Sequence, residues 1–126
     1  MASRSPASGL PRARLLTDDG RELAVVDIAD TAATRARGLL GRTGLAQGCA
    51  LWLAPCRSIH TIGMRFPIDV VYLDHDNYVV SIKERVASFR LTWGGWRSRG
   101  VLEFAAGEVA RLKISEGQRL RFRPEG

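Results

Sequence analysis

Cys56 and His60 are the two residues whose types and spacing come nearest to a catalytic pair. A cysteine thiolate is a nucleophile, and histidine is the base that most often activates it. At this spacing the two side chains could face each other across a turn. The sequence offers no third residue that would orient the histidine, and cysteine is also common at buried positions. We therefore favour a non-enzymatic function and keep a thiol- or histidine-dependent hydrolase that uses this pair as the alternative.

A second set of polar residues lies in and around the most apolar stretch of the chain. In residues 66–73 both alternating faces are apolar, as in a central strand that is buried on both sides. Asp69 stands in the middle of this stretch, where a carboxylate destabilises the fold unless it has a partner. Arg65 is the nearest basic residue on the same face. Glu103 alternates with apolar neighbours in another run, so it is also expected to point into a polar interior.

These polar residues allow two interpretations, a structural network that fixes strand register or a polar cleft that binds a ligand. In the second interpretation Arg65 meets an anionic group of a small molecule or peptide, and Asp69 holds Arg65 in place. His60 or Thr61 donates hydrogen bonds to the ligand. The sequence thus predicts a small binding or accessory module. Its expected ligand-binding residues are His60, Thr61, Arg65, Asp69, Glu103, Trp93 and Trp96.

Aromatic residues alternate with arginines in residues 84–100, around the pair Gly94 and Gly95. Aromatic side chains beside arginines are typical of proteins that bind single-stranded nucleic acid. The same composition also suits a lid over an apolar pocket or a cover over the end of a barrel. Because arginines are spread along the whole chain, a focused nucleic-acid face is not expected. Weak binding of single-stranded nucleic acid through Trp93 and Trp96 remains a second alternative.

No metal site and no cofactor are expected. The available soft or borderline ligands are Cys49, Cys56, His60 and His75, and their spacing does not match the closely spaced pairs of structural zinc sites. Residues 74–77 contain the oxygen ligands of a calcium loop but lack its glycine. We interpret them as a polar hairpin turn.

The elements that must position these residues are short. A hairpin is expected around Asp19 and Gly20, because an Asp-Gly pair between apolar runs is typical of a tight turn. We expect strands at 14–16, 22–28, 49–54, 66–73, 78–82, 101–105 and 118–123, and short helices at 31–40 and 107–112. Residues 84–100 have the least regular pattern.

Many short strands with only two short helices favour a β-rich α+β domain. The expected form is a compact rolled sheet or a partly closed small β-barrel. We expect one globular domain over residues 14–124, because the chain is too short for two domains of ordinary size. Residues 1–13 are rich in Ser, Pro, Ala and Arg and are expected to form a disordered lead-in.

The composition is basic, with a formal net charge of +6, and Lys83 and Lys113 are the only lysines. Arginine-rich chains suit anionic partners, although a GC-rich genome gives the same composition, and we favour the genomic explanation. No apolar run reaches membrane-spanning length. The first residues lack the apolar core of a secretory signal, so we expect a cytoplasmic protein, or an exported one if a signal has been removed. A monomer or weak homo-oligomer is expected.

Three blocks of sequence, residues 37–42, 56–61 and 64–74, resemble the domain-of-unknown-function family 192 of bacteria and archaea. Residues 101–103, followed by Ala106, Gly107 and Gly117, resemble the C-terminal pattern of that family. The resemblance extends over nearly all of residues 15–122. It implies a small β-rich domain and no established activity. The family usually has Gly-Asp where this chain has Gly117 and Gln118. A role that the family's aspartate has at this position is therefore not expected in this chain.

Cys49 and Cys56 should be free thiols in the folded protein. An extended strand and Pro55 separate them, and at about 3.3 Å per residue their Cα atoms lie far beyond disulfide reach. Titration of the native and the unfolded protein under non-reducing conditions should find two thiols in the unfolded chain. A protein without titratable thiols in either state would contradict this prediction.

Overall fold

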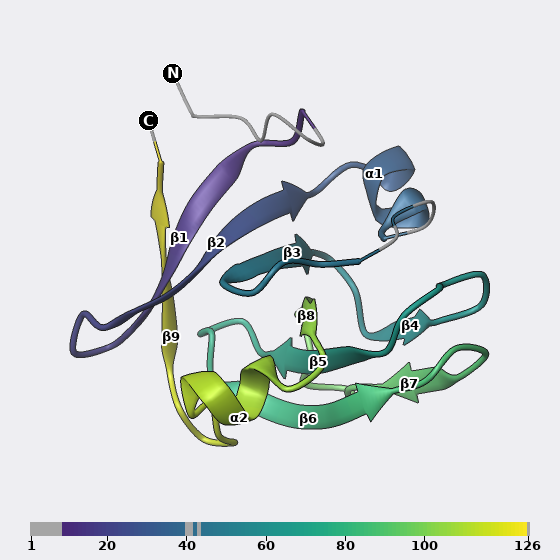
Figure 1. Cartoon of the computed structure of the whole chain (residues 1–126). Coiled ribbons are helices and arrows are strands. Elements are labelled where there is room, and N and C mark those ends of the chain that lie inside the picture. Colours follow the sequence, from purple (N-terminus) through teal and green to yellow (C-terminus); the bar gives the residue numbers. More distant parts are fainter. Residues whose placement is uncertain (1–8, 40–41, 43, 126) are drawn as a thin grey trace.

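The computed structural model describes residues 9–39, 42 and 44–125. Strands dominate these residues, and two short helices accompany them (Figure 1). The elements are β1 Arg12–Thr17, β2 Glu22–Ala29, α1 Ala32–Arg37, β3 Cys49–Leu53, β4 Ser58–His60, β5 Ile68–Leu73, β6 Val79–Val86, β7 Leu91–Trp93, β8 Gly100–Ala105, α2 Glu108–Leu112 and β9 Leu120–Pro124. No described helix is long and apolar enough to cross a membrane.

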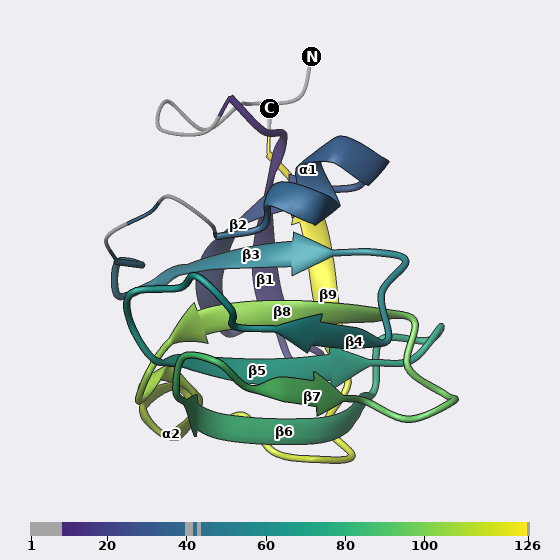
Figure 2. The ribbon, with the colours of Figure 1, turned by 90° about the vertical axis from the view of Figure 1, so that its right-hand side faces the viewer.

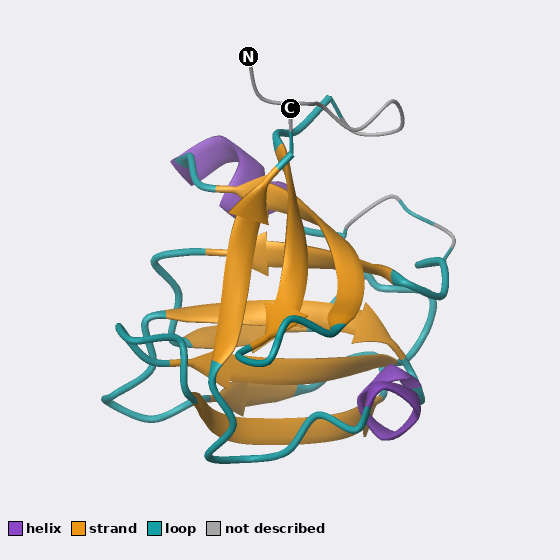
Figure 3. Cartoon of the chain, turned by 90° about the vertical axis from the view of Figure 1, so that its left-hand side faces the viewer, coloured by secondary structure: helices purple, strands orange, loops and turns teal. Residues whose placement is uncertain are grey.

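A seven-stranded mixed sheet with the order β6-β5-β8-β3-β2-β1-β9 is the main structure. Its strand pairs are antiparallel except for β2 and β3, which run parallel. The sheet is strongly rolled, so that β1 and β9 cross steeply behind the layer of β3, β8, β5 and β6 (Figures 2 and 3). An isolated bridge between Tyr78 and Arg119 joins the beginnings of β6 and β9 at one corner. The sheet is not closed into a barrel, so of the two predicted forms the rolled sheet is confirmed.

Strands β5 and β8 are buried on both faces, as the apolar run at 66–73 predicted. Val71, Leu102 and Phe104 face the inside of the roll, where α2 completes a first hydrophobic core. Val70 and Tyr72 face the other side and belong to a second core. We call this second side the outer face of the sheet. A two-stranded sheet of β4 and β7 and the segment after α1 cover it (Figure 2).

The strands of the seven-stranded sheet lie close to their predicted places, whereas β4 and β7 were not among the expected strands. The hairpin of β1 and β2 is present, and the side chain of Thr31 caps α1 by accepting a hydrogen bond from the N–H of Thr34. Helix α1 ends at Arg37, and the residues predicted to finish it, Leu40 and Gly41, lie outside the described residues, as does most of the predicted lead-in. The segment 84–100 is more regular than predicted, because it contains the end of β6 and the whole of β7.

Asp69 is wholly buried, and its carboxylate is satisfied by backbone groups. One oxygen accepts from the N–H of Arg85 at 2.9 Å, and the other accepts from Gly107 at 3.0 Å and Val109 at 2.9 Å. Asp69 therefore caps the start of α2 from a neighbouring strand. It also holds a bulge of β6, where the register with β5 shifts and Arg85 has a φ of +52°.

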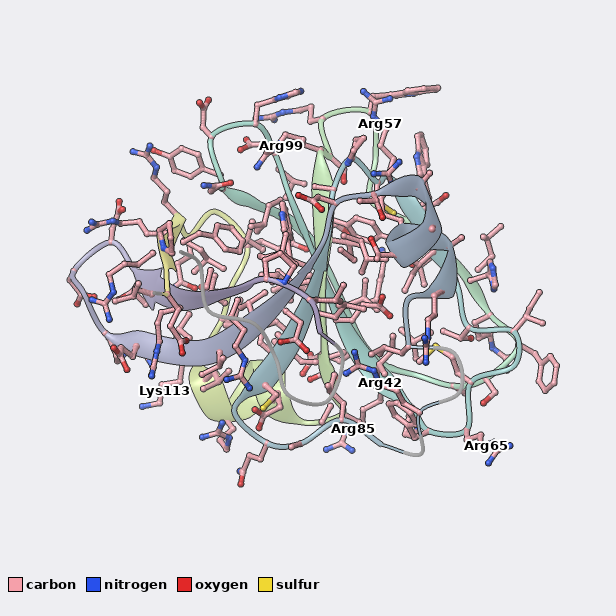
Figure 4. The ribbon with its side chains drawn as sticks, turned by 90° about the horizontal axis from the view of Figure 1, so that it is seen from above. Arg42, Arg57, Arg65, Arg85, Arg99 and Lys113 are labelled. Atoms are coloured by element: carbon pink, nitrogen blue, oxygen red, sulfur yellow. The ribbon has the colours of Figure 1, made fainter. Side chains whose placement is uncertain are left out.

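The predicted ion pair between Arg65 and Asp69 was wrong. Arg65 is exposed and lies before the start of β5, so it does not share a strand face with Asp69. Figure 4 shows its side chain at the periphery of the molecule. The carboxylate instead uses backbone N–H groups from segments that are far apart in the sequence, which no pairing rule within one strand could identify.

Asp69→Ala should lower the free energy of unfolding by more than about 3 kcal/mol, because three backbone donors would lose their acceptor and a buried unpaired donor costs roughly 1–3 kcal/mol. Urea unfolding measures this loss. Asp74→Ala is a matched control, since Asp74 accepts two backbone N–H groups in an exposed turn and its loss should cost only about 1 kcal/mol. Arg65→Met should change stability by less than about 0.5 kcal/mol. If Arg65→Met lost as much stability as Asp69→Ala, the result would show that Arg65 and Asp69 do form an ion pair.

Candidate functional site

A pocket of about 260 Å³ opens on the outer face of the sheet. It lies between the end of α1, the connection from β3 to β4, and the loop after β4. We call it the Glu103 pocket, after the residue that distinguishes it. Its lining residues are Arg35, Ala36, Arg37, Gly38, Leu39, Leu53, Pro55, Cys56, Ser58, Ile59, His60, Met64 and Glu103.

Glu103 is the buried acid of this pocket, with 4% of its surface exposed. It lies on β8 in the centre of the sheet, where Leu51 of β3 and Val70 of β5 are its neighbours in register. No hydrogen bond or ion pair joins its carboxyl group to any residue that the structure describes. Burial raises the pKa of Glu103 to about 7, against the opposing effect of the positive charge of Arg42. The group therefore exchanges its proton near neutral pH.

The other buried acids of the chain are partnered. Asp69 accepts its three backbone hydrogen bonds, and Glu108 binds Arg111 through two hydrogen bonds and accepts a third from the N–H of Gly48. The hydrogen bonds from Arg111 are the main cause that lowers the pKa of Glu108. Glu103 is thus the exception among them, and its unpaired carboxyl group faces a space that a ligand could enter.

Cys56 lies beside the acid at the end of the β3–β4 connection. Its thiol is half-buried and donates to the carbonyl oxygen of Ser58 at 3.0 Å. Burial is the main cause that raises the pKa of Cys56, and the negative charge of Glu103 raises it further. A catalytic thiolate needs the opposite shift. The environment of Cys56 therefore keeps it protonated at neutral pH.

Basic side chains lie at the mouth of the Glu103 pocket. The guanidinium of Arg35 is held by the carbonyl oxygens of Asp30 at 2.8 Å and Ala54 at 3.4 Å. Arg37 and His60 are exposed on α1 and β4. The apolar side chains of the lining come from the second core. The pocket thus combines an acid at its base, an apolar wall and basic groups at its opening.

Gly38 allows the chain to pass close over the acid. It ends α1 with a φ of +48°, a conformation that side chains with a Cβ rarely adopt. A Cβ built on Gly38 would lie 3.9 Å from an oxygen of Glu103. That distance is an ordinary van der Waals contact, so the backbone conformation and not crowding is what favours glycine here.

The structure separates the residues that the sequence grouped into one cleft. It brings His60 and Glu103 to the same pocket and adds Cys56, but it places the others elsewhere. Thr61 is wholly buried, where its hydroxyl donates to the carbonyl oxygen of Ala87 at 2.6 Å and accepts from the N–H of Arg90 at 2.8 Å. Its hydroxyl group is therefore used in holding the β4 loop against the β6–β7 connection.

Trp93 and Trp96 do not line the Glu103 pocket. They contact each other edge to face, with ring centroids 5.2 Å apart, on the exposed side of the β4–β7 sheet. Trp93 is 50% and Trp96 77% exposed. Asp69 is also outside the pocket, because it faces the inside of the roll and caps α2. Sequence reasoning missed Arg35, Arg37 and Met64, although the blocks 37–42 and 64–74 had been recognised as motifs.

The described residues contain no group of three or more His, Cys, Asp or Glu side chains that could hold a metal ion. Cys49 and Cys56 are both free, as the strand between them predicted.

Comparison with known proteins gives a family match and similar folds. A family model described as "Uncharacterized ACR" matches residues 14–122. A protein of unknown function from Novosphingobium aromaticivorans DSM 12444 has a TM-score of 0.80 and 24% identity, over 96% of this chain and 92% of that chain. A candidate transcription regulator from Sinorhizobium meliloti 1021 has a TM-score of 0.75 and 26% identity, over 88% of this chain and 92% of that chain. Among curated proteins none matches the chain.

The buried acid makes a specific prediction for the pH dependence of stability. Because the pKa of Glu103 is raised from 4.5 to about 7 on folding, the folded state holds the proton more tightly, and stability should fall as pH rises between these values. Glu103→Gln should remove this fall and, above pH 7, should be more stable than the natural protein by up to about 3 kcal/mol. Urea unfolding at a series of pH values measures both effects.

Glu108→Gln is the matched control, because its carboxylate is paired and its pKa is lowered. This variant should be less stable than the natural protein at neutral pH. A pH profile of Glu103→Gln that runs parallel to that of the natural protein would contradict the raised pKa of Glu103.

Proposed function

The chain belongs to the DUF192 family, as its motifs predicted, and because this family has no established activity we propose a function from the site itself. We propose that the protein is a small-molecule binding module and that its ligand occupies the Glu103 pocket. The ligand donates a hydrogen bond to Glu103 at the base and presents an anionic group to the basic residues at the mouth. An amino acid or a peptide terminus has this combination of groups.

The unpaired carboxyl group of Glu103 is the observation on which this proposal rests. Burying an acid without a hydrogen bond is unfavourable, and the rest of the sheet offers it no partner. A ligand ammonium, amide N–H or hydroxyl group would supply the missing hydrogen bond in a site from which water is largely excluded. This hydrogen bond would contribute to the binding free energy of the ligand.

The mouth of the pocket favours an anionic second group. Arg37 of α1 and His60 of β4 are exposed lining residues, and Arg35, whose guanidinium is held by two carbonyl oxygens, lines the same pocket. A carboxylate between these groups would make charge-assisted hydrogen bonds. The volume of about 260 Å³ is at the small end for ligand sites, which favours a ligand of amino-acid or dipeptide size.

Two other functions are less consistent with these features. A thiol hydrolase would need Cys56 as a thiolate, whereas burial and Glu103 raise its pKa. Binding of single-stranded nucleic acid would use Trp93 and Trp96, but these rings contact each other edge to face and present no pair of parallel faces for bases. We therefore retain the binding module, with residues 14–124 as its single domain. We take it as cytoplasmic and active as a monomer or weak homo-oligomer.

An NMR screen of free amino acids, short peptides and hydroxy acids against the ¹⁵N-labelled protein tests this proposal. We expect a hit to shift the amide signals of Gly38, Cys56 and Ile59 and to stabilise the protein against heat. Glu103→Gln should weaken such a ligand about tenfold or more, because a hydrogen bond to a charged group contributes roughly 1.5–3 kcal/mol. His60→Ala should weaken the anionic members of the screen more than the neutral ones.

Thr92→Ala is a suitable control. The hydroxyl of Thr92 forms a hydrogen bond with the hydroxyl of Tyr72, and Thr92 does not line the pocket. Hits that shift only the signals around Trp93 and Trp96, or that bind Glu103→Gln as tightly as the natural protein, would refute the proposed site.

A further inference from the structure

A second pocket lies on the other side of Pro55 and Cys56. It has a volume of about 290 Å³, and its remaining lining residues are Arg57, His75, Ser98 and Arg99. We call it the Arg99 pocket. No acidic residue lines it, in contrast to the Glu103 pocket. Figure 4 shows Arg57 and Arg99 on the same edge of the molecule, opposite Arg65 and Arg85.

Arg99 has hydrogen-bonding capacity that the protein does not use. Its Nε is buried and without a partner among the described residues. One terminal nitrogen donates to the side-chain oxygen of Asn77 at 3.4 Å, and the guanidinium lies over the ring of Trp52 at 5.7 Å. These two contacts fix the plane of the group. No carboxylate of the described residues lies within ion-pair distance of Arg99, which sets it apart from arginines such as Arg111 and Arg123.

Arg57 is also oriented by backbone contacts and has no carboxylate partner among the described residues. Its Nε donates to the carbonyl oxygen of Ser98 at 3.1 Å, which leaves its terminal nitrogens available. The segments that bear the two arginines are joined by further bonds. The N–H of Cys56 donates to the carbonyl oxygen of Arg99 at 2.7 Å. The hydroxyl of Ser98 donates to the carbonyl oxygen of Cys56 at 3.4 Å. Hydrogen bonds within the protein thus hold the two segments that line the Arg99 pocket in place without a ligand.

We propose that the Arg99 pocket binds a phosphate group, free or as part of a phosphate ester. Two arginines and a histidine line the space from three different connections of the chain, which suits a tetrahedral oxyanion better than a planar carboxylate. A bound phosphate would be held through the terminal nitrogens of Arg57 and Arg99, because the Nε of Arg57 already donates to Ser98 and the Nε of Arg99 is enclosed by the protein. This site is separate from the Glu103 pocket and does not depend on the function proposed for it.

Titration of the ¹⁵N-labelled full chain with inorganic phosphate, at constant ionic strength with chloride as the replacement, tests this site. We expect saturable shifts of the Arg57, Ser98 and Arg99 amide signals and of the Nε–H of Arg99. Phenyl phosphate should bind as well or better, whereas acetate should give no saturable shift. Arg57→Gln and Arg99→Gln should each weaken phosphate binding about tenfold or more, because a charge-assisted hydrogen bond contributes roughly 1.5–3 kcal/mol.

Two control variants separate a specific site from general charge. Arg121→Gln and Arg65→Gln reduce the net charge by the same amount and should bind phosphate as the natural protein does, and Glu103→Gln should also bind it normally. Arg99→Gln loses the contact with Asn77 and could fail to fold. In that case Arg57→Gln tests the proposal, because Arg57 is exposed. Shifts that do not saturate, equal binding of acetate, or an equal loss in Arg121→Gln would overturn the proposal.

Discussion

The carboxylate of Asp69 is the interaction on which the geometry of this protein depends. It lies on a central strand and binds the N–H groups of a bulge in β6 and of the first turn of α2. The N–H of Val109 would otherwise be buried without an acceptor, and those of Arg85 and Gly107 would lose their partner in a partly buried environment. One short side chain therefore determines where β6 bends and where the chain after β8 becomes helical. These two points set the direction of the connections on both sides of the β5–β8 pair.

Asp69 and Glu103 show how the position within a sheet decides whether a buried acid finds hydrogen-bond donors. They belong to neighbouring strands, and Val70, the residue after Asp69, is paired in register with Glu103. Asp69 lies near the start of its strand, where a bulge of β6 and the start of α2 provide free backbone donors. Glu103 lies in the middle of the sheet, where the neighbouring backbone donors take part in the strand ladders. The first acid is therefore structural, and the second retains an unpaired carboxyl group and a pKa raised to about 7.

The short connection from β3 to β4 separates a pocket that contains a buried acid from a pocket that no acidic residue lines. Pro55 and Cys56 line both the Glu103 pocket and the Arg99 pocket. Glu103 lies on one side of the connection, and Arg57 and Arg99, which have no carboxylate partner among the described residues, lie on the other. The raised pKa of Cys56 follows from this position, because its thiol is half-buried and has Glu103 nearby. The connection thus contributes residues to both pockets.

The sequence by itself determined the elements and the general form of the domain. Apolar patterns located the strands of the seven-stranded sheet, although not β4 and β7, and an Asp-Gly pair located the first hairpin, because these signals act within a few residues. The same local reasoning separated the two cysteines and placed Glu103 on the face opposite Leu102 and Phe104. Only the tertiary structure decided which partner each polar side chain has. Backbone N–H groups are chemically alike at almost every residue, so nothing in the sequence marks Gly107 and Val109 as the donors for Asp69. The pockets, likewise, are formed by segments whose proximity results from the rolling of the sheet, a long-range packing effect that no local pattern encodes.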